Sequence, residues 1–305
     1  MKTTSKTAAD STALRKKRYK DRYLSLPAII WVAIVTQIPF AATVVISTLK
    51  WNLKRPDQGV QFDWLNNYAY YFWGSGSSDF WKIFFQTIEL VLIALLGCTL
   101  LGFLLALLLD NKFPGVNIVR TLLLGPFFVM STTSAVVWKT TILNMTFGWY
   151  GHIAKLLGGK AIDLITFYPL QTVAILFIWQ WMPFFMLVIL SGLQSISEEV
   201  LESASLDGAN WFQMTFRIKL PMITSYMEVA LMLGLLFLVK EFGLIWIIGG
   251  NNKNAYSLSY YIYEIVFSAQ RPGRAAAVSV VMVALVTVMV NLLYKSIRRR
   301  SANGL

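Results

Sequence analysis

The sequence has few of the side chains that most enzymes and metal proteins depend on. It contains one cysteine and one histidine in 305 residues. A disulfide within the chain is therefore impossible, and His152 has no second histidine or cysteine with which to bind a metal ion. Cys98 lies in the apolar run "LLGCTLLG", where a packing role is expected, and His152 is expected at the surface. No set of catalytic groups converges, which argues against an enzyme.

Charge is also scarce. Charged residues make up 14% of the chain, against about 25% in a typical soluble domain. The charges are clustered, so the tracts Pro27–Leu49, Leu164–Ser197 and Ala275–Tyr294 contain none. Because about 20 apolar residues span a bilayer, these tracts indicate a multi-span membrane protein. A soluble protein with the same tracts as buried core helices is the alternative.

The apolar tracts predict an all-α membrane protein with six transmembrane helices. The apolar run that follows residues 1–23 is too long for a signal-peptide core and has no small-residue cleavage site, so we expect it to be an uncleaved first span. The six predicted spans are Leu26–Leu49, Ile83–Leu109, Arg120–Trp138, Leu170–Leu193, Pro221–Ile248 and Ala275–Tyr294.

Basic residues predict the orientation. The N-terminal tail, residues 1–23, carries eight Lys and Arg, and four more follow the last span. Positive charge favours the cytoplasmic side, so both tails (1–23 and 298–305) and the loop at 194–220 are expected there, around a membrane domain at 24–297. A basic tail can also bind nucleic acid, but beside a membrane span an inside anchor is the simpler interpretation. No nucleic-acid partner is predicted.

A polar stretch, "ESASLDGANWFQMTFRIKLP", separates the fourth and fifth spans. Ser195 is expected to cap a helix, with Glu198 as its capping-box partner. Asp207 and Gly208 predict a turn after about three helical turns, and Pro221 suits the start of the next span. The result is a short surface helix with small residues that another protein can contact. A plain connecting helix is the alternative.

The same stretch resembles the EAA loop of permease subunits of binding-protein-dependent ABC importers. The family pattern has Glu-Ala-Ala, then a Gly and a final Leu-Pro. The spacing of these residues matches throughout, and the one difference in residue type is Ser203 in place of the middle alanine. The residues that carry the match are Glu202, Ser203, Ala204, Asp207, Gly208, Ala209, Leu220 and Pro221.

Two further stretches, "FPGVNIVRTLLLGPFFVMSTTSAVVWK" and "GGNNKNAYSLSYYIYEIVFSAQRPGRAAAVSVV", resemble the maltose-type sugar branch of this family. The resemblance extends over residues 24–295, and "FLVKEFGLIW" is most similar to sorbitol/mannitol-type polyol permeases. It implies the type I ABC importer permease fold in a bacterial cytoplasmic (inner) membrane. It also implies three partners: a second, homologous permease, a dimeric ATPase and an extracytoplasmic solute-binding protein.

The resemblance assigns ATP to another chain. In the family, the EAA loop forms a coupling helix that docks in a cleft of the ATPase. The nearest stretch to a phosphate loop is "LLGGKAID", which has neither the earlier Gly nor the Ser or Thr after Lys160. We therefore expect this chain to bind no cofactor, and ATP and Mg²⁺ to be used by the partner ATPase.

Charged residues inside predicted spans are candidate functional residues. A charge at mid-membrane costs about 2.5–3.5 kcal/mol on insertion scales. Lys240 and Glu241 interrupt the fifth span, at the part that lines the substrate path in the family, and Glu241 is the expected acceptor for a polyol hydroxyl. A structural ion pair between subunits is the alternative. Glu89 in the second span is expected to have a structural partner.

Polar and aromatic residues in two other spans are further candidates for the path. Trp179, Gln180 and Trp181 precede Pro183, where aromatic faces and an amide suit a sugar-like ligand. Lipid-facing aromatics are the alternative. Ser131 and Ser134 either line the path or join helices. The competing function is an ion- or proton-coupled secondary transporter that uses Glu89, Lys240 and Glu241, but such a protein has no need of an EAA loop.

Overall fold

Four uninterrupted helices are long and apolar enough to cross a membrane in the computed structural model, which describes residues 4–302 except 112 and 251. Each contains one predicted span, except that the first span was predicted to end at Leu49 and α1 ends at Ser47, so the first, second, fourth and sixth spans are confirmed as helices. The outermost residues of the predicted tails, 1–3 and 303–305, lie outside the described part of the chain. The four helices are α1 (Thr4–Ser47), α3 (Ser77–Asp110), α9 (Pro169–Gln194) and α16 (Pro272–Ala302).

The third and fifth predicted spans are broken helices, which the sequence analysis did not predict. Residues 116–128 and 131–142 meet at 95°, and residues 211–222 and 224–239 meet at 65°. If each bent pair crosses the membrane once, six spans result. The elements involved are α4 (Val116–Leu123), α5 (Gly125–Phe128), α6 (Ser131–Val137), the π-helical turn η2 (Trp138–Ile142), α11 (Trp211–Gln213), the π-helical turn η3 (Met214–Lys219), α12 (Leu220–Met222) and α13 (Thr224–Val239).

The backbone departs from helical geometry at each break. Val129 and Met130 have extended backbone, with ψ of 135° each, which ends α5 before α6 begins. In the fifth span, Pro221 has no N–H to donate, and α12 ends one residue later. A second interruption follows α13, because Lys240 and Glu241 lie between α13 and α14 (Gly243–Gly249). The sequence analysis placed these two charges inside the fifth span. In the structure they lie in a gap between two helices.

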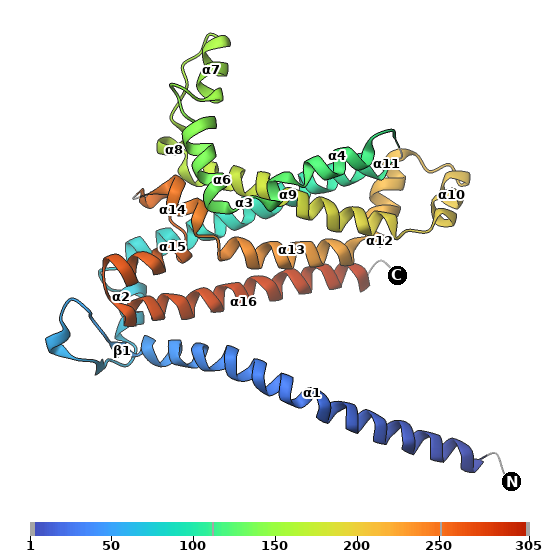
Figure 1. Ribbon diagram of the computed structural model, residues 1–305, viewed down its shortest axis with the longest axis horizontal. Helices are drawn as coiled ribbons and strands as arrows, with labels where there is room; N and C mark the ends of the chain where they lie inside the picture. Colours follow the sequence, from blue (N-terminus) through green and yellow to red (C-terminus); the bar gives the residue numbers. More distant parts are fainter. Residues whose placement is uncertain (1–3, 112, 251, 303–305) are drawn as a thin grey trace.

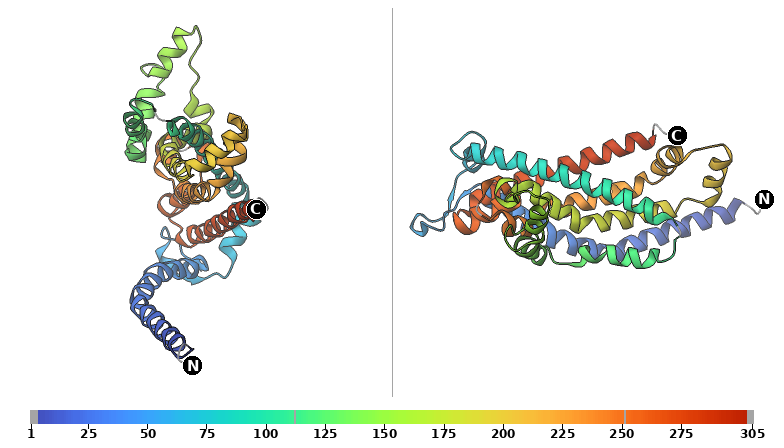
Figure 2. Two further views of the ribbon diagram at one scale, coloured as in Figure 1. Left: turned by 90° about the vertical axis from the view of Figure 1, so that its right-hand side faces the viewer. Right: turned by 90° about the horizontal axis from the view of Figure 1, so that it is seen from above.

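The connecting elements gather mainly at one end of the helical body (Figures 1 and 2). We call this the α2 end and the opposite one the α10 end. The described ends of α1 and α16 that lead to the termini both lie at the α10 end. The remaining elements are β1 (Leu49–Lys50), η1 (Pro56–Gln58), β2 (Gln61–Phe62), α2 (Asn66–Phe72), α7 (Trp149–Leu156), α8 (Leu164–Phe167), α10 (Glu198–Leu206), η4 (Lys253–Ala255), α15 (Leu258–Tyr263) and η5 (Glu264–Ser268). The two short strands pair antiparallel.

Helices α3, α9 and α13 form the packed core. A Cβ added at Gly102 of α3 would lie 2.8 Å from Cβ of Phe185 and 3.0 Å from the backbone nitrogen of Met186 on α9. Gly234 of α13 lies against the ring of the same Phe185, which is fully buried. Interiors packed at this density move as units, because they cannot absorb added volume.

Helix α1 is attached to the body near its Ser47 end. Asn67, which is 5% exposed, donates through Nδ2 to the carbonyls of Ser47 and Leu49, both at 2.9 Å. A side chain at Gly273 would collide with the same Leu49 carbonyl. By contrast, none of the most apolar window of α1 is buried. Most of this helix is left for lipid or another protein.

The side of the membrane on which each end lies stays a prediction. The basic tails place the α10 end in the cytoplasm. We expect reporter fusions at Leu305 and within Gly74–Ser78 to report opposite sides, cytoplasmic for Leu305. The same side for both would contradict the six-span arrangement.

Candidate functional site

The polar loop between the fourth and fifth spans is an exposed helical hairpin at the α10 end (Figure 1). Its first limb is α10, which has no buried residue. The predicted capping box at its start is wrong. Ser197 occupies the N-cap position without a side-chain hydrogen bond to the helix, while the Ser195 hydroxyl donates back to the Gly192 carbonyl at 2.7 Å.

The end of α10 is a Schellman motif, which explains the spacing of its small residues. The N–H of Ala209 donates to the carbonyl of Ala204 at 3.0 Å, and the N–H of Gly208 donates to Ser205 at 3.1 Å. These are the 6→1 and 5→2 bonds of the motif. It requires a left-handed residue at its centre, and Gly208 has φ +82°. The turn predicted at Asp207 and Gly208 is therefore present.

The second limb returns to the membrane body through α11, η3 and α12. It starts with a capping box that the sequence reading missed. Asn210 Oδ1 accepts from the N–H of Gln213, and Gln213 Oε1 accepts from the N–H of Asn210, both at 2.9 Å. The Asn-x-x-Gln spacing was a readable signal for it.

The candidate coupling residues fall into two groups. Most gather at the end of α10, and Leu220 and Pro221 lie on α12, beyond the return limb. Beside the first group, Leu206 is 89% exposed and Trp211 is 62% exposed. Exposed apolar side chains next to a tight turn are suited to contact with another protein. The first group consists of Glu202, Ser203, Asp207 and Gly208, which are exposed, and Ala204 and Ala209, which are half-buried.

The fourth-span candidates take different positions around α9, which continues through Pro183 without ending. Gln180 is 4% exposed and donates through Nε2 to the Val129 carbonyl, in the extended link before α6, at 2.7 Å. Trp181 stacks on Phe237 of α13 with ring centroids 4.6 Å apart. Trp179 instead makes an edge contact with Trp138 at 5.4 Å.

Glu241 lies at the centre of the break in the fifth span. Its Oε1 accepts from the N–H of Leu244 at 2.9 Å and so caps α14, while Oε2 accepts from the Ser131 hydroxyl at the start of α6, at 3.2 Å. The Ser259 hydroxyl of α15 donates to the Glu241 carbonyl at 2.7 Å. Glu241 thus joins three segments, whereas its neighbour Lys240 is exposed.

Several buried polar atoms around the 95° bend make no hydrogen bond within the described part of the chain. They come from α6 and α9, which the sequence analysis gave as separate candidates, and from η2, which it did not name. Buried polar groups normally have a partner, and an exception calls for a functional or solvent explanation. The bend therefore contains buried polar atoms that are free to bind a ligand or water. The atoms are the Ser134 hydroxyl, Trp138 Nε1, Gln180 Oε1 and Trp181 Nε1.

Charged groups in the loops at the α2 end are held in their ionised forms. A hydrogen bond from the Thr166 hydroxyl at 2.6 Å, together with the N–H groups at the start of α8, lowers the pKa of Asp163. Lys253 donates to Asp79 at 2.6 Å, and this bond raises the pKa of Lys253. The ion pair fastens η4 to the start of α3.

Comparison with known proteins identifies the chain. A family model described as "Binding-protein-dependent transport system inner membrane component" matches residues 99–303. The chain belongs to this family. Its helical permease fold is confirmed by a bacterial ABC transporter involved in the import of the acidic polysaccharide alginate, with a TM-score of 0.77 at 23% identity over 93% of this chain and 96% of that one.

Curated relatives of this inner membrane component match along almost its whole length. "Probable ABC transporter permease protein YesP" of Bacillus subtilis is 30% identical over 94% of this chain and 93% of its own. The trehalose/maltose transport system permease protein MalF of Thermococcus litoralis is 25% identical over 91% of this chain and 94% of its own. The chain is therefore a transport component and not an enzyme, as its sequence predicted.

Proposed function

We propose that this inner membrane component is the permease subunit of an ATP-driven importer of a carbohydrate or polyol, coupled to a separate ATPase through its EAA loop. The observation that carries the proposal is the exposed end of α10, where a Schellman turn presents Ala204, Gly208 and Ala209 beside Leu206. A tight, exposed turn of small residues allows a partner's backbone to approach closely. The relatives named for trehalose/maltose and alginate transport support a saccharide-like substrate.

The energy source follows from the division of roles between chains. ATP and Mg²⁺ are bound by the ATPase, for which this chain offers α10 as the coupling helix. The complete importer contains a second homologous permease, an ATPase dimer and an external solute-binding protein, within membrane lipid. One solved relative is an alginate transporter in complex with its alginate-bound periplasmic protein, which supports the last of these partners.

The substrate path is proposed to pass the bend near α6 and α9. Gln180 Oε1 and the Ser134 hydroxyl offer hydrogen bonds to substrate hydroxyls, and aromatic rings offer faces for sugar-like C–H groups. Trp179, Trp181 and Ser131 flank these groups, and the exposed Lys240 precedes Glu241 in the sequence. Glu241 is the proposed hydroxyl acceptor, and a sorbitol- or mannitol-like polyol is the proposed substrate.

The test is transport by the purified complex in proteoliposomes, with ATP supplied on the ATPase side. We expect uptake that requires ATP hydrolysis and survives an ionophore that collapses all ion gradients. The expected ligands are those that bind the external binding protein in a panel of polyols and oligosaccharides. Uptake that persists without ATP and disappears with the ion gradient would instead show the secondary transporter.

A further inference from the structure

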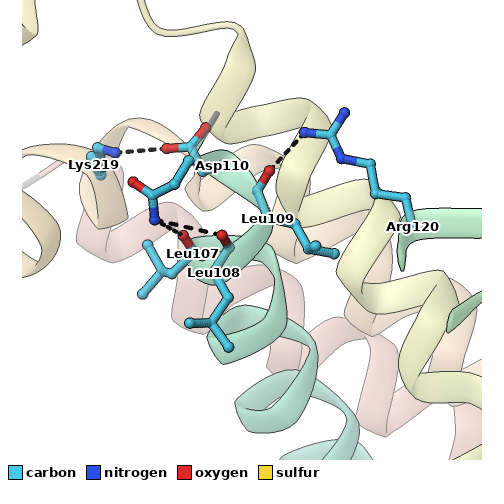
Figure 3. A network of polar contacts seen from close by, with 7 residues as sticks. Leu107, Leu108, Leu109, Asp110, Arg120 and Lys219 are labelled. Atoms are coloured by element: carbon cyan, nitrogen blue, oxygen red, sulfur yellow. Dashed lines mark hydrogen bonds and ion pairs between the residues drawn. The ribbon is translucent and has the colours of Figure 1, made fainter. Parts of the chain in front are cut away.

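The end of α3 that faces the coupling loop is the centre of a polar network (Figure 3). The last carbonyls of a helix have no hydrogen-bond donor within the helix. At the end of α3, the side chains of Asn111 and Arg120 donate to these carbonyls. Asn111 Nδ2 donates to the carbonyls of Leu107 and Leu108 at 3.2 and 3.5 Å, and Arg120 of α4 donates to the Leu109 carbonyl at 2.6 Å. A cation at a helix C-terminus is also favoured by the helix dipole.

The last residue of α3 is paired with the return limb of the coupling loop. Lys219 at the end of η3 donates to Oδ2 of Asp110 at 2.7 Å, and each side chain is 18% exposed. A second contact lies seven residues earlier on α3, where the ring of Phe103 faces that of Phe216 with centroids 6.5 Å apart. The π-helical turn η3 is therefore fixed to α3 at two points.

A hollow on the other side of this network separates it from α10. It has a volume of about 700 Å³, and Asn117, Arg120, Gln194 and Leu201 are among the residues that line it. Helix α10 has no buried residue, but Val200 and Leu201 are half-buried against the core, and Leu201 lines this space. The first limb of the loop therefore touches the body through apolar side chains, while the second limb is attached to α3 by an ion pair and a ring contact.

We propose that the Asp110–Lys219 ion pair is the joint that transmits force from the coupling loop to the substrate path. It connects η3 to α3, and α3 packs closely on α9 at Gly102 and Phe185. Helix α9 carries Gln180, which holds the backbone at the bend. Coupling between distant sites is carried by such rigid, contiguous contacts. Asp110 and Lys219 act as positioning residues and touch neither ATP nor substrate.

The proposal rests on the proposed function and is tested in the complete importer by counting substrate molecules transported per ATP hydrolysed. Asp110→Asn and Lys219→Met each remove one charge. We expect each to lower this ratio by about fivefold to tenfold, the size typical of mutations that perturb coupling between sites, while hydrolysis continues. The double charge reversal Asp110→Lys with Lys219→Asp should restore most of the ratio. A residue with only a structural role would change subunit recovery and leave the ratio of the recovered complex unchanged.

A matched control is the Lys–Asp pair between Lys253 and Asp79, which has the same chemistry but lies at the α2 end with side chains 53% and 46% exposed. Lys253→Met should leave the ratio unchanged. A wild-type ratio in both single variants, or failure of the charge reversal to restore it, would overturn the proposed joint. If a single variant is not recovered, the charge-reversed protein alone decides between these outcomes. Failure of the unmodified complex to bind or use an ATPase would instead refute the proposed function.

Discussion

Gly208→Arg is expected to abolish ATP-driven transport while the membrane helices remain inserted. The left-handed backbone at Gly208, with φ +82°, costs a residue with a side chain about 1–2 kcal/mol. No atom lies within 4 Å of a Cβ placed there, so the arginine side chain would project into the proposed docking surface. We expect recovery of the ATPase, or substrate-stimulated hydrolysis, to fall at least tenfold, which corresponds to about 1.4 kcal/mol.

Two control variants separate the effect of the left-handed backbone from the effect of a bulky side chain on the docking surface. Gly208→Asn keeps a residue that tolerates left-handed backbone, so it should retain most activity. Gly158→Arg places the same side chain at another open glycine with φ +74°, in the segment between α7 and α8. It should retain ATPase binding. Full ATPase recovery, normal stimulation and normal uptake in Gly208→Arg would refute the coupling role of α10.

Glu241→Ala is expected to cause a similarly large loss of transport. The substitution leaves the N–H of Leu244 and the hydroxyl of Ser131 without their acceptor. An unsatisfied buried donor costs about 1–3 kcal/mol, so the geometry of the path beside α6 and α14 should change. We expect substrate-dependent uptake to fall by about tenfold or more, and the assembled complex to be recovered from membranes.

Glu241→Gln removes the charge of the side chain and keeps its shape. The amide oxygen still accepts from Leu244, so α14 keeps its cap, and we expect weaker uptake or an altered order of substrate preference. Glu228→Gln, a glutamate in α13 of the same broken span, provides the matched control and should transport normally. Unchanged transport kinetics in Glu241→Gln would show that the charge of Glu241 does not contact the substrate and that its role is structural.

The sequence predicted the long helices because an uncharged tract of sufficient length has few alternatives to a membrane helix. Leu170–Leu193 matches α9 to within one residue at each end, and Leu26–Leu49 extends two residues beyond the end of the longer helix α1. It did not predict that Arg120–Trp138 bends by 95°, because hydropathy measures how apolar a segment is and not the direction of its axis. The extended backbone at Val129 is set by tertiary contacts such as the Gln180 side chain.

The same limit applies to the candidate sites. The spacing of Ala204, Gly208 and Ala209 is a local property, since a Schellman motif is closed by residues within one turn, and the sequence located it. The Asp110–Lys219 pair joins residues 109 positions apart, and no local pattern specifies such a contact. The sequence singled out Glu241 by its charge, but the hydrogen bond that caps α14 depends on where α13 ends.

The nearly bare surface of α1 has a consequence for how the protein is made. Because none of its most apolar window is buried by the rest of the chain, we expect this part of α1 to be stable in the bilayer as a single helix. Its contacts with later segments include the bonds from Asn67 and Tyr68 near Ser47 and the packing of α16, and these form only after insertion of α1. The first span can therefore set the orientation of the nascent chain before the core of α3, α9 and α13 exists.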